Sequence, residues 1–235
     1  MSKFWKWNDS AVKIPELILE GEIASETWWG DEVTPKLFKD ELNKFKGQDI
    51  TVWINSPGGD VIAGSQIYTM LKEHQGKVSV KIDGLAASSA SFIAMAGDTI
   101  EMSPTAMMMI HLPSTIDWGD KKDFQKTIAR LEEVEAAIIN AYELKTKLPR
   151  DEIAKMMEDE MWMNAYRAKE LGFVDNVLYT ADEEGNQQVP FDFSKKKVNN
   201  CIQNSVKQIQ EKMKKMQNDV ELEKLKIEID LLELQ

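Results

Sequence analysis

The segment INSPGGDVIAG, residues 54–64, followed downstream by GLAASSASF, residues 84–92, decides the fold of this chain. Each segment comes at the end of an apolar run and leads, through glycine and other small residues, into a stretch with helical spacing. A third segment, MMMIHLP at residues 107–113, ends an apolar run with a histidine. Together the three supply the parts of a nucleophilic serine site, namely backbone N–H donors at a loop, a hydroxyl at a turn, and an imidazole.

The spacing of apolar residues predicts strands and helices in alternation. Strands are predicted over residues 16–23, 49–55, 78–82, 99–102 and 107–110, and helices over residues 34–46, 62–74 and 88–96. This order indicates an α/β fold with right-handed crossovers and a mostly parallel sheet. A further periodic run, residues 121–148, predicts a helix of about 42 Å, longer than a small domain requires.

The choice of base is narrow because the chain has two histidines. His74 lies in LKEHQGK, a polar helix end before a glycine, where a histidine commonly complements the helix dipole. His111 closes the apolar strand at residues 107–110 and precedes Pro113. We therefore expect His111 to be the base.

Three serines compete for the role of nucleophile. Ser88 lies where a strand passes through Gly84 into a helix, a turn that exposes a side chain at the edge of a sheet. Ser89 and Ser91 are its rivals, and Ser91 falls one helical turn deeper. The run AASSAS also has a purely structural interpretation, as a small-residue face that lets another element approach closely. Because Ser88 lies at the strand-to-helix turn, we expect it to be the nucleophile.

These segments resemble the Clp protease proteolytic subunit (ClpP) family and, more narrowly, the ClpP-related head maturation proteases of tailed bacteriophages. INSPGG, AAS and MIH stand in the family's order, without a gap over residues 54–88, and the resemblance continues to about residue 180. It implies a ClpP/crotonase-like α/β fold with a mixed, mostly parallel sheet, layered helices and a protruding handle helix over residues 121–148. It also implies homo-oligomeric rings with the active sites inside a chamber.

The resemblance assigns roles residue by residue. Ser88 matches the nucleophile, His111 the base, and the N–H groups of Gly59 and Ser89 the oxyanion hole.

The triad acid falls in the segment EDEMWMNAYRAKELGFVD. Alignment on Trp162 and Gly172 places Glu160 where the family carries an aspartate, with Asp159 as its rival. A glutamate can orient a histidine if the backbone accommodates one more methylene. The alternative is that residues 158–160 form a solvated acidic turn, which the dipole of the next helix would favour.

The sequence divides into three parts. We expect a protease domain over residues 1–180, a linker over residues 181–197, and a helical tail over residues 198–235. The tail has apolar residues at helical spacing between charged flanks, which predicts a coiled coil or a partner-binding helix, with a solvated helix of low stability as the alternative. In a phage protease, such an extension would be a scaffold-like segment.

Composition excludes several classes of function. With 235 residues and a net charge of −11, the chain is acidic, which argues against nucleic-acid binding. The single cysteine, Cys201, allows no intrachain disulfide or cysteine metal cluster, and no metal or cofactor is expected. No apolar stretch approaches the roughly 20 residues of a membrane span, and the N-terminus lacks the apolar core of a signal peptide. We expect a cytoplasmic protein that does not bind membranes.

The resulting functional expectation is a serine endopeptidase that cleaves scaffold or capsid precursor proteins during phage head maturation, in the host cytoplasm or inside the prohead. The alternative is a cellular ClpP-like housekeeping protease that works with an unfoldase. The N-terminus MSKFWKWND differs from the axial segment through which the family meets a Clp ATPase, which argues against that partner. Two further interpretations are a crotonase-like enzyme and a catalytically inactive ring. The pairing of Ser88 with His111 argues against both.

Overall fold

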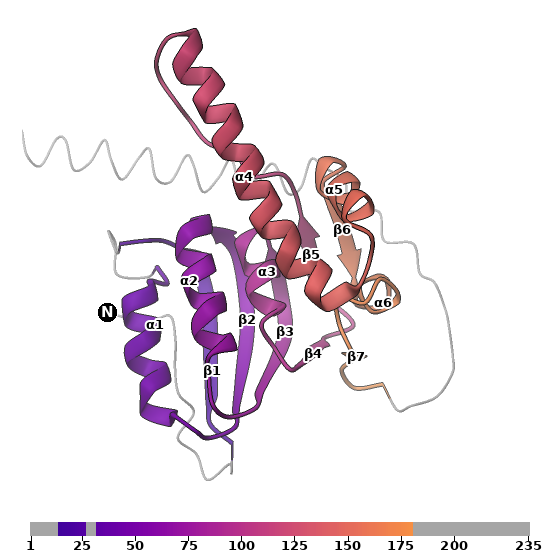
Figure 1. Cartoon of the computed structure of the whole chain (residues 1–235). Coiled ribbons are helices and arrows are strands. Elements are labelled where there is room, and N and C mark those ends of the chain that lie inside the picture. Colours follow the sequence, from indigo (N-terminus) through magenta and orange to yellow (C-terminus); the bar gives the residue numbers. More distant parts are fainter. Residues whose placement is uncertain (1–13, 27–31, 181–235) are drawn as a thin grey trace, which may run out of the picture. The chain divides into compact units, whose positions relative to one another are not determined.

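The computed structural model describes residues 14–26 and 32–180, which form a seven-stranded sheet flanked by helices (Figure 1). The strand order is β1-β2-β3-β4-β7, with β5 paired to β3 and β6 paired to β5. All pairings are parallel except that of β5 with β6. The strands are β1 (Glu16–Ile23), β2 (Ile50–Gly59), β3 (Val78–Ala87), β4 (Thr99–Met102), β5 (Met107–Ile110), β6 (Met161–Asn164) and β7 (Asn176–Val177).

Helices α1, α2 and α3 lie along one face of this sheet (Figure 1). The helices are α1 (Pro35–Leu42), α2 (Val61–Lys72), α3 (Ser89–Ala94), α4 (Lys121–Thr146), α5 (Arg150–Glu158) and α6 (Ala165–Glu170), and a 3₁₀ turn (Asn43–Phe45) follows α1. The other face carries mostly polar side chains on β3 and β4. On it, Lys81 Nζ lies 5.1 Å from the centre of the Trp53 ring and 3.9 Å from the Glu101 carboxylate. Successive side chains along a strand point to opposite faces of the sheet, so the apolar ones enter the core and the polar ones between them face away from it.

Parallel pairing brings the three motifs to one edge of the sheet. Ser56 of β2 lies in register with Ala86 of β3, and Ala87 of β3 lies in register with Met109 of β5. Because the strands run in the same direction, their carboxyl ends meet, and the loops that follow them meet as well. The glycine loop, the serine turn and the histidine are thus neighbours in space.

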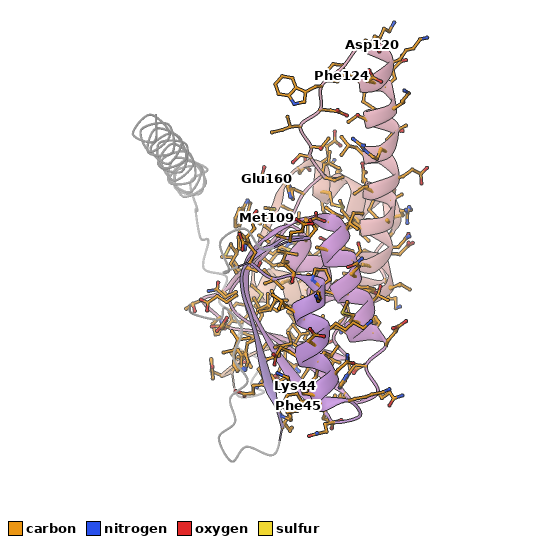
Figure 2. All side chains as sticks on the ribbon, turned by 90° about the vertical axis from the view of Figure 1, so that its left-hand side faces the viewer. Lys44, Phe45, Met109, Asp120, Phe124 and Glu160 are labelled. Atoms are coloured by element: carbon orange, nitrogen blue, oxygen red, sulfur yellow. The ribbon has the colours of Figure 1, made fainter. Side chains whose placement is uncertain are left out.

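Helix α4 projects beyond the other elements (Figure 1). Most of its buried residues lie in its second half, among them Ile138, Ile139 and Tyr142. Phe124 and Ile128 in the first half are 49% and 57% exposed, and Figure 2 shows Phe124 at the far end of the helix. Only the base of the helix is therefore anchored in the core.

The far end of α4 is stabilised by local hydrogen bonds. The Asp120 carboxylate accepts from the backbone N–H groups of Lys122 and Asp123, and the Asp123 carboxylate accepts from the Asp120 N–H, a complete capping box. In the preceding loop, the carboxylate of Asp117 accepts from Thr127 and, at 3.3 Å, from Arg130. Hydrogen bonds from the Thr127 hydroxyl and the Trp118 backbone N–H, with a smaller effect of Arg130, lower the pKa of Asp117, which keeps its carboxylate charged.

The expected α/β class and mostly parallel sheet are confirmed. Strands β2 and β3 run further than predicted because their pairing continues into the small-residue loops at residues 56–59 and 83–87. The long helix ends at Thr146, where Lys147 adopts a left-handed conformation with φ 62°. The structure adds α5 and β6, which the apolar pattern did not predict. The linker at residues 181–197 and the tail at residues 198–235 lie outside the described residues and stay predictions.

Replacing Asp120 with alanine should fray the first turn of α4, because two backbone N–H groups lose their acceptor. Loss of such a cap costs about 1 kcal/mol, so amide hydrogen exchange in residues 121–124 should rise about fivefold. Exchange measured by mass spectrometry checks this. The substitution Glu133→Ala, at an exposed position in the middle of the same helix, is the control, and unchanged exchange in Asp120→Ala would contradict the assignment of the cap.

Candidate active site

The hydroxyl of Ser88 and the imidazole of His111 form a hydrogen bond. The Ser88 Oγ to His111 Nε2 distance is 2.8 Å. Ser88 stands between β3 and α3 with φ 53° and ψ −126°, a left-handed region that non-glycine residues rarely adopt. Its backbone N–H donates to the carbonyl of Met109 at 3.0 Å, which ties the turn to β5. A strained serine between a strand and a helix is the geometry of an exposed nucleophile.

The rival serines face elsewhere. Ser89 Oγ is buried and has no hydrogen-bond partner among the described residues. Ser91 is fully buried, and its hydroxyl bonds to the Ser88 carbonyl and to the hydroxyl of Tyr142. Neither hydroxyl is directed at His111, so the structure pairs the histidine with Ser88.

The second histidine lies at the other end of β2. His74 is in the loop after α2, and its Nε2 lies 2.7 Å from the carbonyl of Gln48, just before β2 begins. The serine turn is next to the carboxyl end of β2, so His74 is remote from Ser88 along the strand direction.

Glu160 lies opposite His111. Strands β5 and β6 pair antiparallel, and their last pair is Ile110 with Met161. His111 follows Ile110 and Glu160 precedes Met161, so the two residues leave the ladder at the same end. Glu160 also has a left-handed backbone, with φ 49°. Its carboxylate Oε1 accepts from the indole N–H of Trp162 at 3.4 Å. Met109, the residue of β5 that anchors the serine turn, pairs with Trp162, two residues after Glu160.

No hydrogen bond joins Glu160 to His111 among the described residues. The carboxylate acts on the imidazole through its charge instead. The rival Asp159 caps the C-terminus of α5, and its backbone N–H donates to Lys155. Glu160 is therefore close enough to affect the pKa of His111 through its charge, but it lacks the hydrogen bond that a triad acid makes to its histidine.

Two opposing effects act on His111. Burial lowers the pKa of the imidazole, and the negative charge of Glu160 raises it, with burial the stronger effect. The net pKa lies below the usual value of 6.5, so the ring is neutral at pH 7. A neutral imidazole is the form that can accept the proton of a serine hydroxyl.

The glycine loop packs directly on the serine turn. A Cβ added to Gly58 would lie 2.6 Å from the carbonyl oxygen of Ala87 and 2.7 Å from Ser88 Cβ. Gly59 has φ 148°, and a Cβ there would overlap the carbonyl oxygen of Ile23 in β1. Only glycine fits at both positions, because the backbone of the loop must approach both the nucleophile and β1.

The sequence did not predict the role of Ser56 in the glycine loop. The fully buried hydroxyl of Ser56 donates to the Gly21 carbonyl at 2.6 Å and accepts from the Gly58 N–H at 3.1 Å. It thereby fixes the loop to β1. The signal was present as the serine before Pro57 in INSPGG, but spacing alone does not reveal the partner of a hydroxyl.

Metal ligands do not gather in the described part of the chain. Within residues 14–26 and 32–180, no group of three or more histidine, cysteine or acidic side chains is placed to hold an ion. No helix in these ranges is both long and apolar enough to cross a membrane.

Comparison with known proteins places the chain in a family. A family model of Clp proteases matches residues 11–181. The chain belongs to the Clp protease family. It is 31% identical over 179 residues to the "ATP-dependent Clp protease proteolytic subunit 1" of Chlamydia pneumoniae, which covers 71% of this chain and 94% of that relative. The proteolytic subunits of Bacteroides fragilis and Deinococcus radiodurans are 32% and 29% identical, covering 56% and 60% of this chain and 65% and 71% of their own.

Membership in this family makes the chain a ClpP-like serine peptidase, as the sequence predicted. The narrower expectation, a phage head maturation protease, finds no support among these relatives. They are named as Clp proteolytic subunits, which favours the alternative of a cellular Clp-type protease.

The pKa of His111 can be measured directly, since the chain has two histidines and a His74→Gln background leaves one signal. In that background, the imidazole of His111 should titrate below pH 6.5. Glu160→Gln removes the charge that stabilises the imidazolium, so the pKa should fall further. Imidazole carbon and nitrogen shifts recorded by NMR against pH test this. A pKa that rises or stays constant in Glu160→Gln would show that the carboxylate does not act on the ring.

Proposed function

We propose that Ser88 is the nucleophile of this Clp-family peptidase and that His111 is its general base. The observation that carries the proposal is the 2.8 Å hydrogen bond between Ser88 Oγ and a neutral, half-buried imidazole. The N–H groups of Gly59 and Ser89 are the proposed oxyanion hole, supported by the direct packing of the glycine loop on the serine turn.

The chemistry follows from these positions. His111 Nε2 takes the proton of the Ser88 hydroxyl as Oγ bonds to the scissile carbonyl carbon, and the carbonyl oxygen becomes an oxyanion facing the two N–H donors. When the C–N bond breaks, the imidazolium returns that proton to the leaving amine. Water, deprotonated by the same imidazole, then attacks the acyl-enzyme, and Ser88 regains its proton.

Glu160 is proposed to stabilise the imidazolium formed in these steps. Its charge already favours the protonated ring, and the Trp162 indole restrains the carboxylate at 3.4 Å. Without a direct hydrogen bond to His111, this support is electrostatic and weaker than that of a hydrogen-bonded aspartate.

For the substrate, we propose unfolded polypeptide delivered by an ATP-driven partner to a homo-oligomeric ring. The support is similarity to relatives named as ATP-dependent Clp proteolytic subunits. This is the function that the comparisons favour.

Head maturation of a phage capsid is the second candidate, because of one specific observation. The alignment with the Chlamydia pneumoniae subunit covers 94% of that subunit but only 71% of this chain. The match to the family model ends at residue 181. Residues 198–235 beyond it have the apolar spacing of a coiled coil. A helical extension of this kind suits a protease that is carried into an assembling shell with its scaffold.

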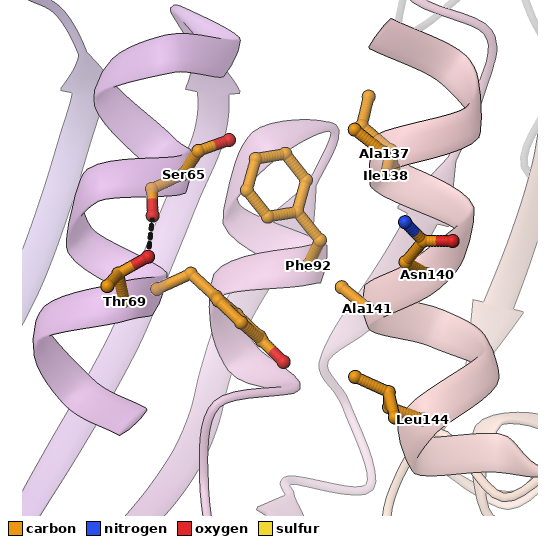
Figure 3. Close-up of a pocket in the computed structure, with 9 residues that line it drawn as sticks. Ser65, Thr69, Phe92, Ala137, Ile138, Asn140, Ala141 and Leu144 are labelled. Carbon is orange, nitrogen blue, oxygen red and sulfur yellow. Dashed lines mark hydrogen bonds between the residues drawn. The ribbon is translucent and has the colours of Figure 1, made fainter. Parts of the chain in front are cut away.

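Labelling with a fluorophosphonate should modify Ser88 and no other serine, because among the described residues only this hydroxyl is hydrogen-bonded to an imidazole. Peptide mapping by mass spectrometry locates the adduct, and Ser88→Ala should abolish both labelling and peptide hydrolysis. The control is Ser65→Ala, which removes an exposed hydroxyl on α2 (Figure 3) and should retain both. Adducts at Ser89 or Ser91, or peptidase activity that survives in Ser88→Ala, would refute the assignment.

Two substrates distinguish a cellular Clp-type protease from a head maturation protease. Each is incubated with the full-length protein, and Ser88→Ala is the inactive control. An unfolded casein is incubated with a Clp ATPase, with and without ATP, and a phage capsid precursor with its scaffold is incubated without ATPase. ATP-stimulated loss of casein supports the cellular function. Cleavage of capsid or scaffold at discrete sites without ATPase would replace it with head maturation.

A further inference from the structure

A buried chain of hydrogen bonds runs from helix α4 to the serine turn. The Tyr142 hydroxyl lies 2.7 Å from Ser91 Oγ, and Ser91 Oγ lies 2.5 Å from the carbonyl oxygen of Ser88. The same carbonyl also accepts from the backbone N–H of Ser91 at 3.0 Å. Two side chains outside the catalytic set are therefore linked in series to the backbone of the proposed nucleophile.

The direction of this chain follows from the chemistry of its members. A carbonyl oxygen can only accept, so the single proton of the Ser91 hydroxyl must point to Ser88. That leaves Ser91 Oγ as an acceptor toward Tyr142, so the phenol donates. The order is Tyr142 O–H to Ser91 Oγ, and Ser91 O–H to the Ser88 carbonyl.

The held carbonyl belongs to the same peptide unit as the Ser89 N–H. A trans peptide is planar, and its C=O and N–H point in opposite directions. Fixing the Ser88 carbonyl on the core side therefore fixes the Ser89 N–H on the other side of the peptide plane. We propose that Tyr142 and Ser91 are positioning residues that aim the Ser89 N–H at the substrate oxyanion. This inference rests on the proposed role of Ser88 as nucleophile.

The surroundings of Tyr142 make it a rigid donor. Its side chain is almost fully buried, and its ring meets Phe173 edge to face at 5.6 Å between centroids and an angle of 62°. Burial raises the pKa of the phenol, so it stays protonated at every pH at which the enzyme works. Ser91 is fully buried as well. Water does not compete for either hydroxyl.

The restraint also has a reason in the backbone. Ser88 is held at φ 53°, a conformation that costs on the order of 1 to 3 kcal/mol for a non-glycine residue. The Met109 carbonyl restrains the N–H of Ser88, and Ser91 restrains its carbonyl. Without the Ser91 hydroxyl, only the backbone N–H of Ser91 would hold this carbonyl. The Ser88–Ser89 peptide would then tilt toward an ordinary conformation, and the N–H donor would turn away from the oxyanion.

The test uses full-length Tyr142→Phe, Ser91→Ala and the double variant. Loss of an oxyanion donor lowers kcat by roughly 100- to 1000-fold, and a tilted donor should cost less. We expect kcat for a chromogenic peptide to fall about tenfold in Ser91→Ala and about threefold in Tyr142→Phe, with KM unchanged, since a misplaced group acts on the transition state. The affinity of a peptide boronate, whose tetrahedral adduct places an oxygen in the hole, should fall in parallel.

The double variant separates positioning from packing. If Tyr142 acts through Ser91, Tyr142→Phe should have no further effect on kcat in the Ser91→Ala background. Phe173→Leu is the matched control, because it loosens the packing of the Tyr142 ring but leaves both hydroxyls. It should lower Tm while kcat per labelled Ser88 remains that of the unmodified protein.

Each outcome decides one question. Retained kcat and boronate affinity in both single variants, with Ser88 still labelled, overturn the positioning role and leave the proposed nucleophile intact. Equal losses of kcat in Phe173→Leu and Tyr142→Phe reduce the role of Tyr142 to stability. Failure of the unmodified protein to react with a fluorophosphonate at Ser88 refutes the proposed function, and the positioning role falls with it.

Discussion

The candidate site depends on the parallel pairing of β3 with β2 on one side and with β5 on the other. Parallel strands end at the same edge, so the glycine loop at the end of β2, the serine turn after β3 and the histidine after β5 meet there. The backbone bond from the Ser88 N–H to the Met109 carbonyl is the last rung of this pairing. The positions of the Ser88 and His111 backbones relative to each other are thus set by the pairing of β3 with β5.

Two strained residues flank the same imidazole. Ser88 has φ 53° and Glu160 has φ 49°, and each would relax if its neighbours allowed it. Ser88 is restrained by bonds to Met109 and Ser91, and the N–H of Glu160 donates to the carbonyl of Met157 at 3.2 Å. Their strain is balanced by a core that continues beneath both turns. The core therefore does more than stabilise the fold, since it holds two unfavourable backbone conformations in place.

Much of this arrangement could be predicted from the sequence, because strand ends and small-residue turns are local signals. The pattern located the turn at Ser88 and the strand end at His111, and the number of histidines left little choice of base. Pairings between distant segments could not be predicted in the same way. Tyr142 fits the apolar spacing of its helix, so nothing in the pattern reveals that its hydroxyl meets Ser91. The bond from Trp162 to Glu160 depends on rotamers, which spacing does not determine.

The state of His111 follows from where its acidic neighbour is held. A carboxylate bonded directly to the ring would raise the pKa of the imidazole more strongly, and the ring would then be protonated over more of the neutral range. Here the Trp162 indole restrains the carboxylate, and its charge only partly offsets the effect of burial. In the proposed mechanism, holding the Glu160 carboxylate off the ring makes His111 a weaker base. It also raises the fraction of the imidazole that is neutral at pH 7 and able to accept the Ser88 proton.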